Sequence, residues 1–250
     1  MNKKTILAVA VATLAFGQLA KAQTNIQLFY DFGSDRKQVT TTIEGFYNDN
    51  WGNTFFFVDH DFNHKDIGGT KAINGTYMEI ARCLNFWHSV PVLNAFSLQV
   101  EYNGGVYKNY TINHSFLAGV DYFLHSADFN NTFNFKVLYK HVCQATQKVP
   151  MQFTFVWGMQ DLFGVKGLRF SGFADFWWED HVLYNDKKGS LASAQLSHVV
   201  FLSEPQLWYN VGKHIGVDNL NVGGEVELSF NFAGNCGFMC NPCIGTKWVF

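Results

Sequence analysis

The stretch Phe96–Asn103 reads FSLQVEYN, and apolar and polar residues alternate in it at every position. Successive side chains of a β-strand point to opposite faces, so such a strand has one apolar face and one polar face. The same alternation recurs in Ile26–Phe32, in Phe133–Lys140, where Leu138 interrupts it, and in Leu220–Phe232. Alternation of period two therefore dominates the chain and predicts an all-β fold.

Counting these segments predicts about twelve strands, each close to the roughly 9–11 residues that a tilted strand needs to cross a bilayer. We expect them over residues 25–33, 37–48, 54–63, 75–86, 95–104, 112–123, 132–141, 151–159, 167–178, 199–211, 218–232 and 243–250. Proline cannot donate to a sheet ladder, so Pro205 predicts a bulge or bend in the tenth strand. The longer connections, Glu179–His198 among them, are expected at the end of the barrel opposite the chain termini.

The composition indicates that these strands lie in a membrane. Hydrophobic residues make up 48% of the chain and aromatic residues 17%, whereas only 15% are charged, against roughly 25% in an ordinary soluble domain. After residue 22 the sequence has no run of about 18 apolar residues, as a transmembrane helix would need. Together with the alternation, this predicts a transmembrane antiparallel up-and-down β-barrel. The net charge of −2 gives no indication of a nucleic-acid partner.

Both ends of the sequence predict export to the outer membrane. Met1–Lys4 is basic, Thr5–Gly17 is apolar, and Ala20–Ala22 has the small-x-small pattern that signal peptidase cuts. We therefore expect a signal peptide at residues 1–22 and a barrel at residues 23–250. The last strand ends in Phe250 and is similar to the signal that the outer-membrane assembly machinery reads. Expected partners are that machinery, outer-membrane lipid and a small solute, and the last strand should pair with the first.

Five cysteines are present, at Cys83, Cys143, Cys236, Cys240 and Cys243. Three thiols in one loop without a nearby histidine make an incomplete zinc site, so we expect no metal. We favour one disulfide within the loop that contains Cys236, and the sequence does not assign the pairs. Without a nucleophile elbow or a glycine-rich phosphate loop, we expect neither an enzyme nor a cofactor.

The stretch Trp51–Asp61 (WGNTFFFVDHD) is the strongest candidate for a solute site. If Phe56 and Val58 face lipid, then the opposite face points into the lumen, with Phe55, Phe57, Asp59 and Asp61 on it. Aromatic rings beside carboxylates suit a flat polar solute, because rings stack and carboxylates accept hydrogen bonds. An equally weighted alternative is that the rings merely fill a narrow barrel.

Alternation predicts further inward side chains, namely Phe173, Asp175, Trp177, Arg169, Ser171, Glu225, Glu227, Glu44, Glu101, Asp121, Lys136 and Lys247. Phe173, Asp175, Trp177 and Glu225 complete the candidate solute-binding set. Unpaired carboxylates in a lumen favour cations or hydroxyl-rich neutral solutes over anions. The alternative is that Lys136, Arg169 and Lys247 pair with the carboxylates and brace the wall.

Trp51–Asp59 resembles the Trp-Gly-Asp-x-Phe-x-Phe-x-Asp region of the Tsx family, the nucleoside-specific channels of outer membranes, with Asn53 where that pattern usually has Asp. The segments Leu28–Phe32, Glu204–Leu207 and Gly223–Glu225 are similar to the family as well. The resemblance implies a monomeric twelve-stranded barrel that passes nucleosides. The cysteine-bearing loop is not a feature of that family.

Two functions follow from the sequence. The first is an outer-membrane channel for passive uptake of nucleosides or similar small polar solutes. The second is a non-conducting outer-membrane barrel that acts through its outer loops as a binding or structural protein.

Overall fold

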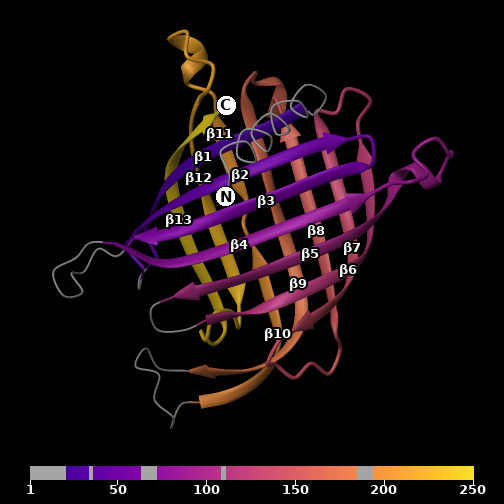
Figure 1. The fold of residues 1–250 in the computed structure, drawn as a ribbon. Coiled ribbons are helices and arrows are strands. Elements are labelled where there is room, and N and C mark those ends of the chain that lie inside the picture. Colours follow the sequence, from indigo (N-terminus) through magenta and orange to yellow (C-terminus); the bar gives the residue numbers. More distant parts are fainter. Residues whose placement is uncertain (1–20, 34–35, 63–71, 108–110, 185–193) are drawn as a thin grey trace, which may run out of the picture.

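The strands close into a single antiparallel barrel in the computed structural model, which describes residues 21–33, 36–62, 72–107, 111–184 and 194–250 (Figure 1). Each strand pairs with its neighbour in sequence, except that β10 and β11 do not pair with each other, and the sheet closes where β13 pairs with both β12 and β1. The strands are β1 (Lys21–Asp31), β2 (Val39–Asp49), β3 (Gly52–Phe62), β4 (Ile73–Leu84), β5 (Phe96–Tyr107), β6 (Thr111–His125), β7 (Asn131–Val142), β8 (Met151–Gln160), β9 (Leu168–Tyr184), β10 (Ala194–Ser203), β11 (Gln206–Tyr209), β12 (Leu220–Phe230) and β13 (Phe238–Val249).

The last strand seals the barrel against the first, as expected from the sequence. Ile26 faces Trp248 in the register, and Tyr30 faces Ile244. The backbone N–H of Phe250 donates to the carbonyl oxygen of Thr24 at 2.9 Å. The prediction of a closed transmembrane barrel is therefore confirmed.

The expected irregularity at Pro205 divides the tenth wall position into two strands. β10 and β11 both lie between β9 and β12, one above the other, and the break falls at Glu204 and Pro205. The N–H of Glu204 donates to the carbonyl of Phe173 at 3.1 Å, and Pro205 accepts from the N–H of Val226 at 3.0 Å. Gly172 on β9 makes room for this break, because a Cβ there would lie 2.4 Å from the carbonyl oxygen of Glu204. The barrel thus has twelve wall positions, built from thirteen strands.

The two faces of the wall are those of a membrane barrel. On β1, the outward Ile26, Leu28 and Tyr30 are 40%, 50% and 41% exposed, whereas the inward Gln27 and Phe29 are buried. The same contrast separates outward Val137 from inward Lys140 on β7. A soluble barrel would bury its apolar face, so this arrangement fits lipid outside and a polar lumen inside. Among the described residues, no helix is long and apolar enough to cross a lipid bilayer.

Part of the lumen is nevertheless apolar and tightly packed. Leu138, which interrupts the alternation of its strand, is fully buried on the inner face. Leu117, Val142 and Val200 are buried with exposures of 2% each. The lumen is therefore not a uniformly polar tube, and these side chains occupy part of it beside β6, β7 and β10.

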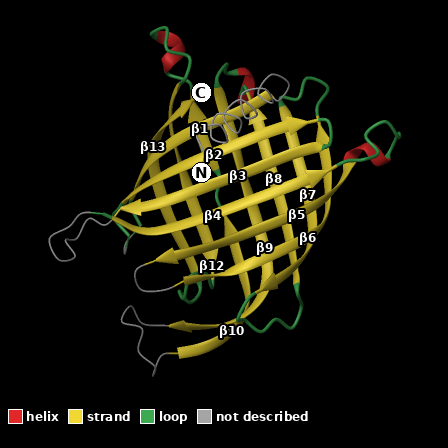
Figure 2. Ribbon diagram, viewed as in Figure 1, coloured by secondary structure: helices red, strands yellow, loops and turns green. Residues whose placement is uncertain are grey.

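Two expectations about the connections are wrong. Glu179–His198 is not a loop, because β9 runs on to Tyr184 and β10 begins at Ala194, so that these two strands continue past the barrel rim (Figure 2). The polar tip predicted at Asp186–Ser190 lies outside the described residues. The asymmetry of loop lengths is also weak, because residues 85–95, at the end where the termini lie, form a connection as long as those opposite.

The five cysteines are free thiols, so the expected loop disulfide is wrong. Cys240 is exposed on the outer face of β13, and Cys243 points inward, with Asn241 as its hydrogen-bond acceptor. An odd separation of three positions on one strand places these two side chains on opposite faces of the sheet. Most of the predicted signal peptide, residues 1–20, lies outside the described residues, and Lys21 and Ala22 belong to β1.

Candidate functional site in the barrel lumen

An aromatic strip follows the inner face of β3 onto β4. The ring centroids of Phe55 and Phe57 are 6.0 Å apart, and those of Phe57 and Tyr77 are 5.8 Å apart. Centroid separations of this size are those of interacting rings. All three side chains keep partial solvent exposure, unlike the sealed inner positions at Gln27 and Leu138. The strip can therefore be reached by water from the lumen.

Two carboxylates continue the same face of β3. Asp59 accepts a hydrogen bond from Thr42 at 2.5 Å, and Asp61 accepts one from Thr40 at 2.6 Å. Both threonines belong to β2, directly opposite in the register. The inward orientation of Phe55, Phe57, Asp59 and Asp61 is thus the one that alternation predicts.

A second acidic wall lies on β9. Phe173, Asp175 and Trp177 share its inner face with Arg169 and Ser171. Asp175 accepts a hydrogen bond from Thr154 on β8, and the indole N–H of Trp177 donates to Glu179 at 3.0 Å. The third acidic wall is β12, where Glu225 accepts from the amide of Gln206 at 2.5 Å. All eight predicted lumen residues therefore lie on the inner surface, on three separate stretches of wall.

The structure brings some of these stretches into electrostatic contact across the lumen. Asp175 on β9 and Glu79 on β4 repel each other, and Glu101 on β5 acts on both. Asp59 on β3 repels Glu225 on β12 in the same way. The two members of each repelling pair therefore come near one another inside the barrel, although their strands are not neighbours in the sheet.

Most of the lumen carboxylates are held by neutral donors rather than by cations. In each case the side chain of a threonine, tyrosine, asparagine or glutamine donates a hydrogen bond to the carboxylate. The pairs are Asn25 with Glu44, Thr42 with Asp59, Thr40 with Asp61, Tyr77 with Glu79, Gln99 with Glu101, Asn134 with Asp121, Thr154 with Asp175 and Gln206 with Glu225. These bonds fix the geometry of the carboxylates, and among the described residues no cation lies within ion-pair distance of these eight.

Two of the lumen lysines, Lys140 and Lys247, lie on aromatic rings. The ammonium group of Lys140 lies 4.0 Å from the centroid of Trp177 and donates to Gln152 at 2.7 Å. The ammonium group of Lys247 lies 4.5 Å from the centroid of Trp208. Among the described residues, no carboxylate lies within ion-pair distance of Lys136, Arg169 or Lys247. The alternative in which these three brace the wall by ion pairs is therefore wrong.

Sequence reasoning missed several members of this surface. Tyr77 and Glu79 lie on β4, where alternation near Arg82 is ambiguous, although their own spacing of two places them on one face. Lys140 follows the alternation of β7 and could have been found from it. Arg36 lies in the connection from β1 to β2, and no periodicity reaches a residue outside a strand. Glu204, at the break in the tenth wall position, is equally beyond that signal.

The described residues contain no grouping of histidine, cysteine, aspartate and glutamate that could hold a metal ion. The acidic lumen therefore contains carboxylates that are dispersed along its wall.

Comparison with known proteins places the chain among barrels of this kind. Residues 22–250 match the family model described as "Domain of unknown function (DUF5020)". No curated protein matches the sequence. The structure is similar to that of the NanC porin, with a TM-score of 0.51, 10% sequence identity and coverage of 90% of this chain and 98% of that one. At this identity the likeness shows the porin-type barrel fold alone.

Two other solved structures have lower similarity. The KdgM porin in complex with disordered oligogalacturonate has a TM-score of 0.45 and 9% identity, and covers 91% of this chain and 99% of its own. OpdK of Pseudomonas aeruginosa with vanillate has a TM-score of 0.41 and 9% identity, and the match covers 92% of this chain and 98% of OpdK.

Proposed function

The chain belongs to the DUF5020 family, a domain of unknown function, and from its barrel we propose that it is an outer-membrane channel for small polar solutes. The observation that carries the proposal is the water-accessible strip of Phe55, Phe57 and Tyr77 beside the carboxylates of Asp59 and Glu79. A barrel that served only as a scaffold would gain no stability from carboxylates placed inside it, because burying a charged group costs free energy.

Nucleosides are the solute class that we propose for this strip. A base has a flat face that stacks on an aromatic ring, and a ribose has hydroxyl groups that donate to carboxylates. The strip provides both kinds of contact within one stretch of wall, which supports passage by successive weak contacts. The resemblance of Trp51–Asp59 to the nucleoside-specific channels supports the same solute.

The proposal includes the location of the protein and its assembly. The apolar outer face supports an outer-membrane location, with lipid around β1–β13 and cleavage of the signal peptide after Ala22. The strand that ends in Phe250 would be the segment read by the assembly machinery. The pairing of β13 with β1 completes the barrel within one chain, which supports a monomer.

Electrical recording in planar bilayers tests the channel. The purified, folded protein should give small, stable conductance steps, and added nucleosides should block them in a concentration-dependent way. Stacking of one base on an aromatic side chain contributes roughly 1–3 kcal/mol, so Phe57→Ala should weaken the block by about tenfold. Asp59→Ala should weaken it as well, because it removes a hydrogen-bond acceptor.

The matched control is Phe56→Ala, because Phe56 is adjacent in sequence and lies on the lipid face of β3. It should leave the block unchanged. Conductance that no nucleoside affects would contradict the proposal that nucleosides are the solute, but not the proposal that the barrel is a channel. A folded barrel without conductance would contradict the channel and favour the non-conducting alternative, for which the β9–β10 extension beyond the rim is the candidate working surface.

A further inference from the structure

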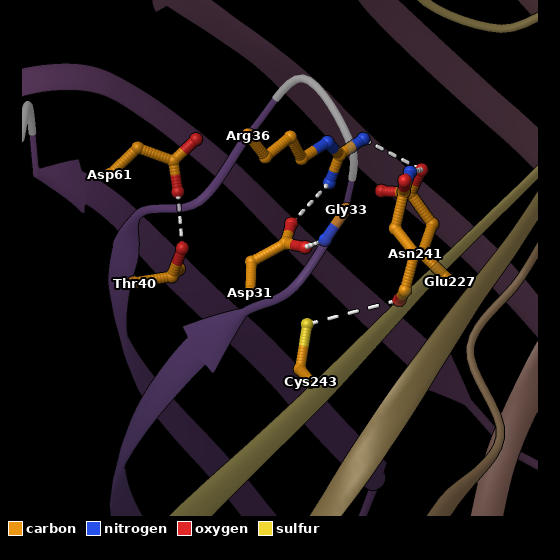
Figure 3. A network of polar contacts seen from close by, with 8 residues as sticks. All are labelled: Asp31, Gly33, Arg36, Thr40, Asp61, Glu227, Asn241 and Cys243. Carbon is orange, nitrogen blue, oxygen red and sulfur yellow. Dashed lines mark hydrogen bonds and ion pairs between the residues drawn. The ribbon is translucent and has the colours of Figure 1, made fainter.

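Arg36 differs from every other cation of the lumen in its contacts. It lies in the connection from β1 to β2, and its guanidinium group points back toward the barrel wall (Figure 3). One nitrogen lies 2.7 Å from a carboxylate oxygen of Glu227 on β12, and another lies 3.4 Å from a carboxylate oxygen of Asp31 on β1. A single side chain from a connecting segment thus joins two wall strands that β13 separates.

The two carboxylates are held in place from other directions too. The backbone N–H of Gly33 donates to Asp31 at 2.6 Å, and the amide of Asn241 on β13 donates to Glu227 at 3.1 Å. Both carboxylates are buried, with side-chain exposures of 4% and 9%, whereas that of Arg36 is 32%. The guanidinium group therefore covers two fixed carboxylates and stands between them and the lumen water.

Elsewhere in the described lumen, eight carboxylates accept hydrogen bonds from neutral donors, and Lys140 and Lys247 lie on tryptophan rings. Arg36 is the one lumen cation of the described residues that lies within ion-pair distance of carboxylates. The other two such pairs, Arg82 with Asp49 and His198 with Asp180, lie outside the lumen. The balance of charge at this end of the lumen thus depends on one side chain.

We propose that Arg36 determines how strongly the channel discriminates between solutes by their charge. The wall carboxylates attract cationic solutes and repel anionic ones, and Arg36 weakens this preference by compensating Asp31 and Glu227 near the end of the barrel opposite the chain termini. The solute class admitted most readily is therefore small cations and neutral solutes, with anions disfavoured. This inference rests on the proposed channel function and adds to it the residue that sets the charge preference.

The physical basis is the local field inside the lumen. One unit charge within about 4–8 Å of the path changes the local concentration of a monovalent ion by roughly two- to fivefold, even with water around it. Fixed charges in a pore act on permeating ions in this way without binding them tightly. Removal of the Arg36 charge and removal of the Glu227 charge must then shift selectivity in opposite directions.

Reversal potentials in a potassium chloride gradient across a planar bilayer test the proposal. Arg36→Gln should raise the ratio of potassium to chloride permeability by roughly two- to fivefold. Glu227→Gln should lower the ratio by a similar factor, because Arg36 then has one partner fewer. Arg36→Lys should stay close to the native ratio, which separates the charge from the packing of the guanidinium group.

Arg82→Gln is the matched control, because Arg82 also pairs with an aspartate, Asp49, but at the exposed end of β2. It should leave the permeability ratio unchanged. Heat-modifiable migration of each variant in gel electrophoresis reports whether its barrel is folded, and Glu227→Gln provides a second route if Arg36→Gln does not fold.

The outcomes separate this inference from the channel itself. Native protein that conducts, with the same reversal potential in Arg36→Gln, Glu227→Gln and Arg36→Lys, overturns the role of Arg36 and leaves the channel intact. Shifts of the same sign in Arg36→Gln and Glu227→Gln also overturn it. Folded native protein that does not conduct overturns both.

Discussion

The ammonium nitrogen of Lys140 lies 4.0 Å from the ring centroid of Trp177, and both side chains are almost completely buried inside the barrel. Trp177 in turn donates its indole N–H to Glu179, and Lys140 donates to Gln152. Three strands of the wall, β7, β8 and β9, are thus connected through Lys140 and Trp177. Among the described residues, no carboxylate lies within ion-pair distance of Lys140.

The contact between Lys140 and Trp177 should be measurable as a coupling energy. Buried cation–π pairs contribute up to about 2 kcal/mol, so Trp177→Leu should destabilise the native barrel more than it destabilises the Lys140→Met variant. Urea unfolding of the refolded protein in a double-mutant cycle gives the difference. Trp178→Leu is the control, since Trp178 is adjacent but outward and packs on Phe153 and Phe176. Trp178→Leu should lower the free energy of unfolding by the same amount in the native protein and in the Lys140→Met variant. If Trp177→Leu also lowers it equally in both, the coupling is refuted.

Gly172 should tolerate no side chain. A Cβ at this position would lie 2.4 Å from the carbonyl oxygen of Glu204 and 2.9 Å from the Cα of Pro205. Gly172→Ala should therefore displace the break between β10 and β11 and cost about 1–3 kcal/mol of stability. Gly104→Ala is the comparison, because the nearest atoms to its Cβ would be the His114 side chain at 3.2 Å and the Tyr102 hydroxyl at 3.4 Å. The urea midpoints of the two variants should differ clearly, and equal midpoints would show that the break can shift without cost.

The turn between β8 and β9 should contribute a stability that acid removes. Asp161 accepts a hydrogen bond from the backbone N–H of Gly167 at 2.7 Å, and bonds to the ionised carboxylate hold its pKa below the ordinary 3.8. A lowered pKa in the folded state stabilises the fold at every pH above the unfolded value, and the stabilisation is lost as the pH falls through the folded value. The native protein should thus exceed Asp161→Asn slightly in urea midpoint at neutral pH and match it at strongly acid pH. A difference that is the same at both pH values would rule out the carboxylate as its source.

The register of β3 should be visible in chemical labelling. In a background with the five native cysteines replaced by serine, a cysteine in place of Phe57 should react with a water-soluble cationic thiol reagent in membranes. The acidic wall concentrates cations, so the anionic reagent of the same size should react more slowly, by about twofold or more. Phe56→Cys should react with neither, because Phe56 faces lipid. Equal labelling at the two positions would contradict the register.

Alternation sufficed for the strands and for the inner face of β3, because both depend on local geometry. Asp59 follows Phe57 by two positions, and a strand has no other way to place them than on one face. The end of β9 at Tyr184 could not be read from the sequence, since polar residues such as Asp180 and His181 are as compatible with an extended hairpin as with a loop. Where pairing with a neighbour rather than lipid contact stabilises a strand, the apolar signal is absent.

The chemistry of the lumen was harder to predict than its lining. The acidic residues were identified, but their neutral partners depend on the register between strands, as for Thr42 opposite Asp59. Arg36 could not be placed at all, since its partners Asp31 and Glu227 are distant in sequence and meet only because the barrel closes. The opposite error concerned Lys247, for which an ion pair was the obvious expectation and a tryptophan ring was the actual neighbour.

The neutral donors that hold the lumen carboxylates have a consequence for the behaviour of the protein in salt. Ionic strength weakens attraction between opposite charges, but it leaves a hydrogen bond from threonine or asparagine nearly unchanged. The shape of the wall at Asp59, Asp175 and Glu225 should therefore persist from dilute media to brine, while the attraction of its charges for a cation fades. If the barrel conducts as we propose, salt should weaken its preference for cations without changing the shape of its wall.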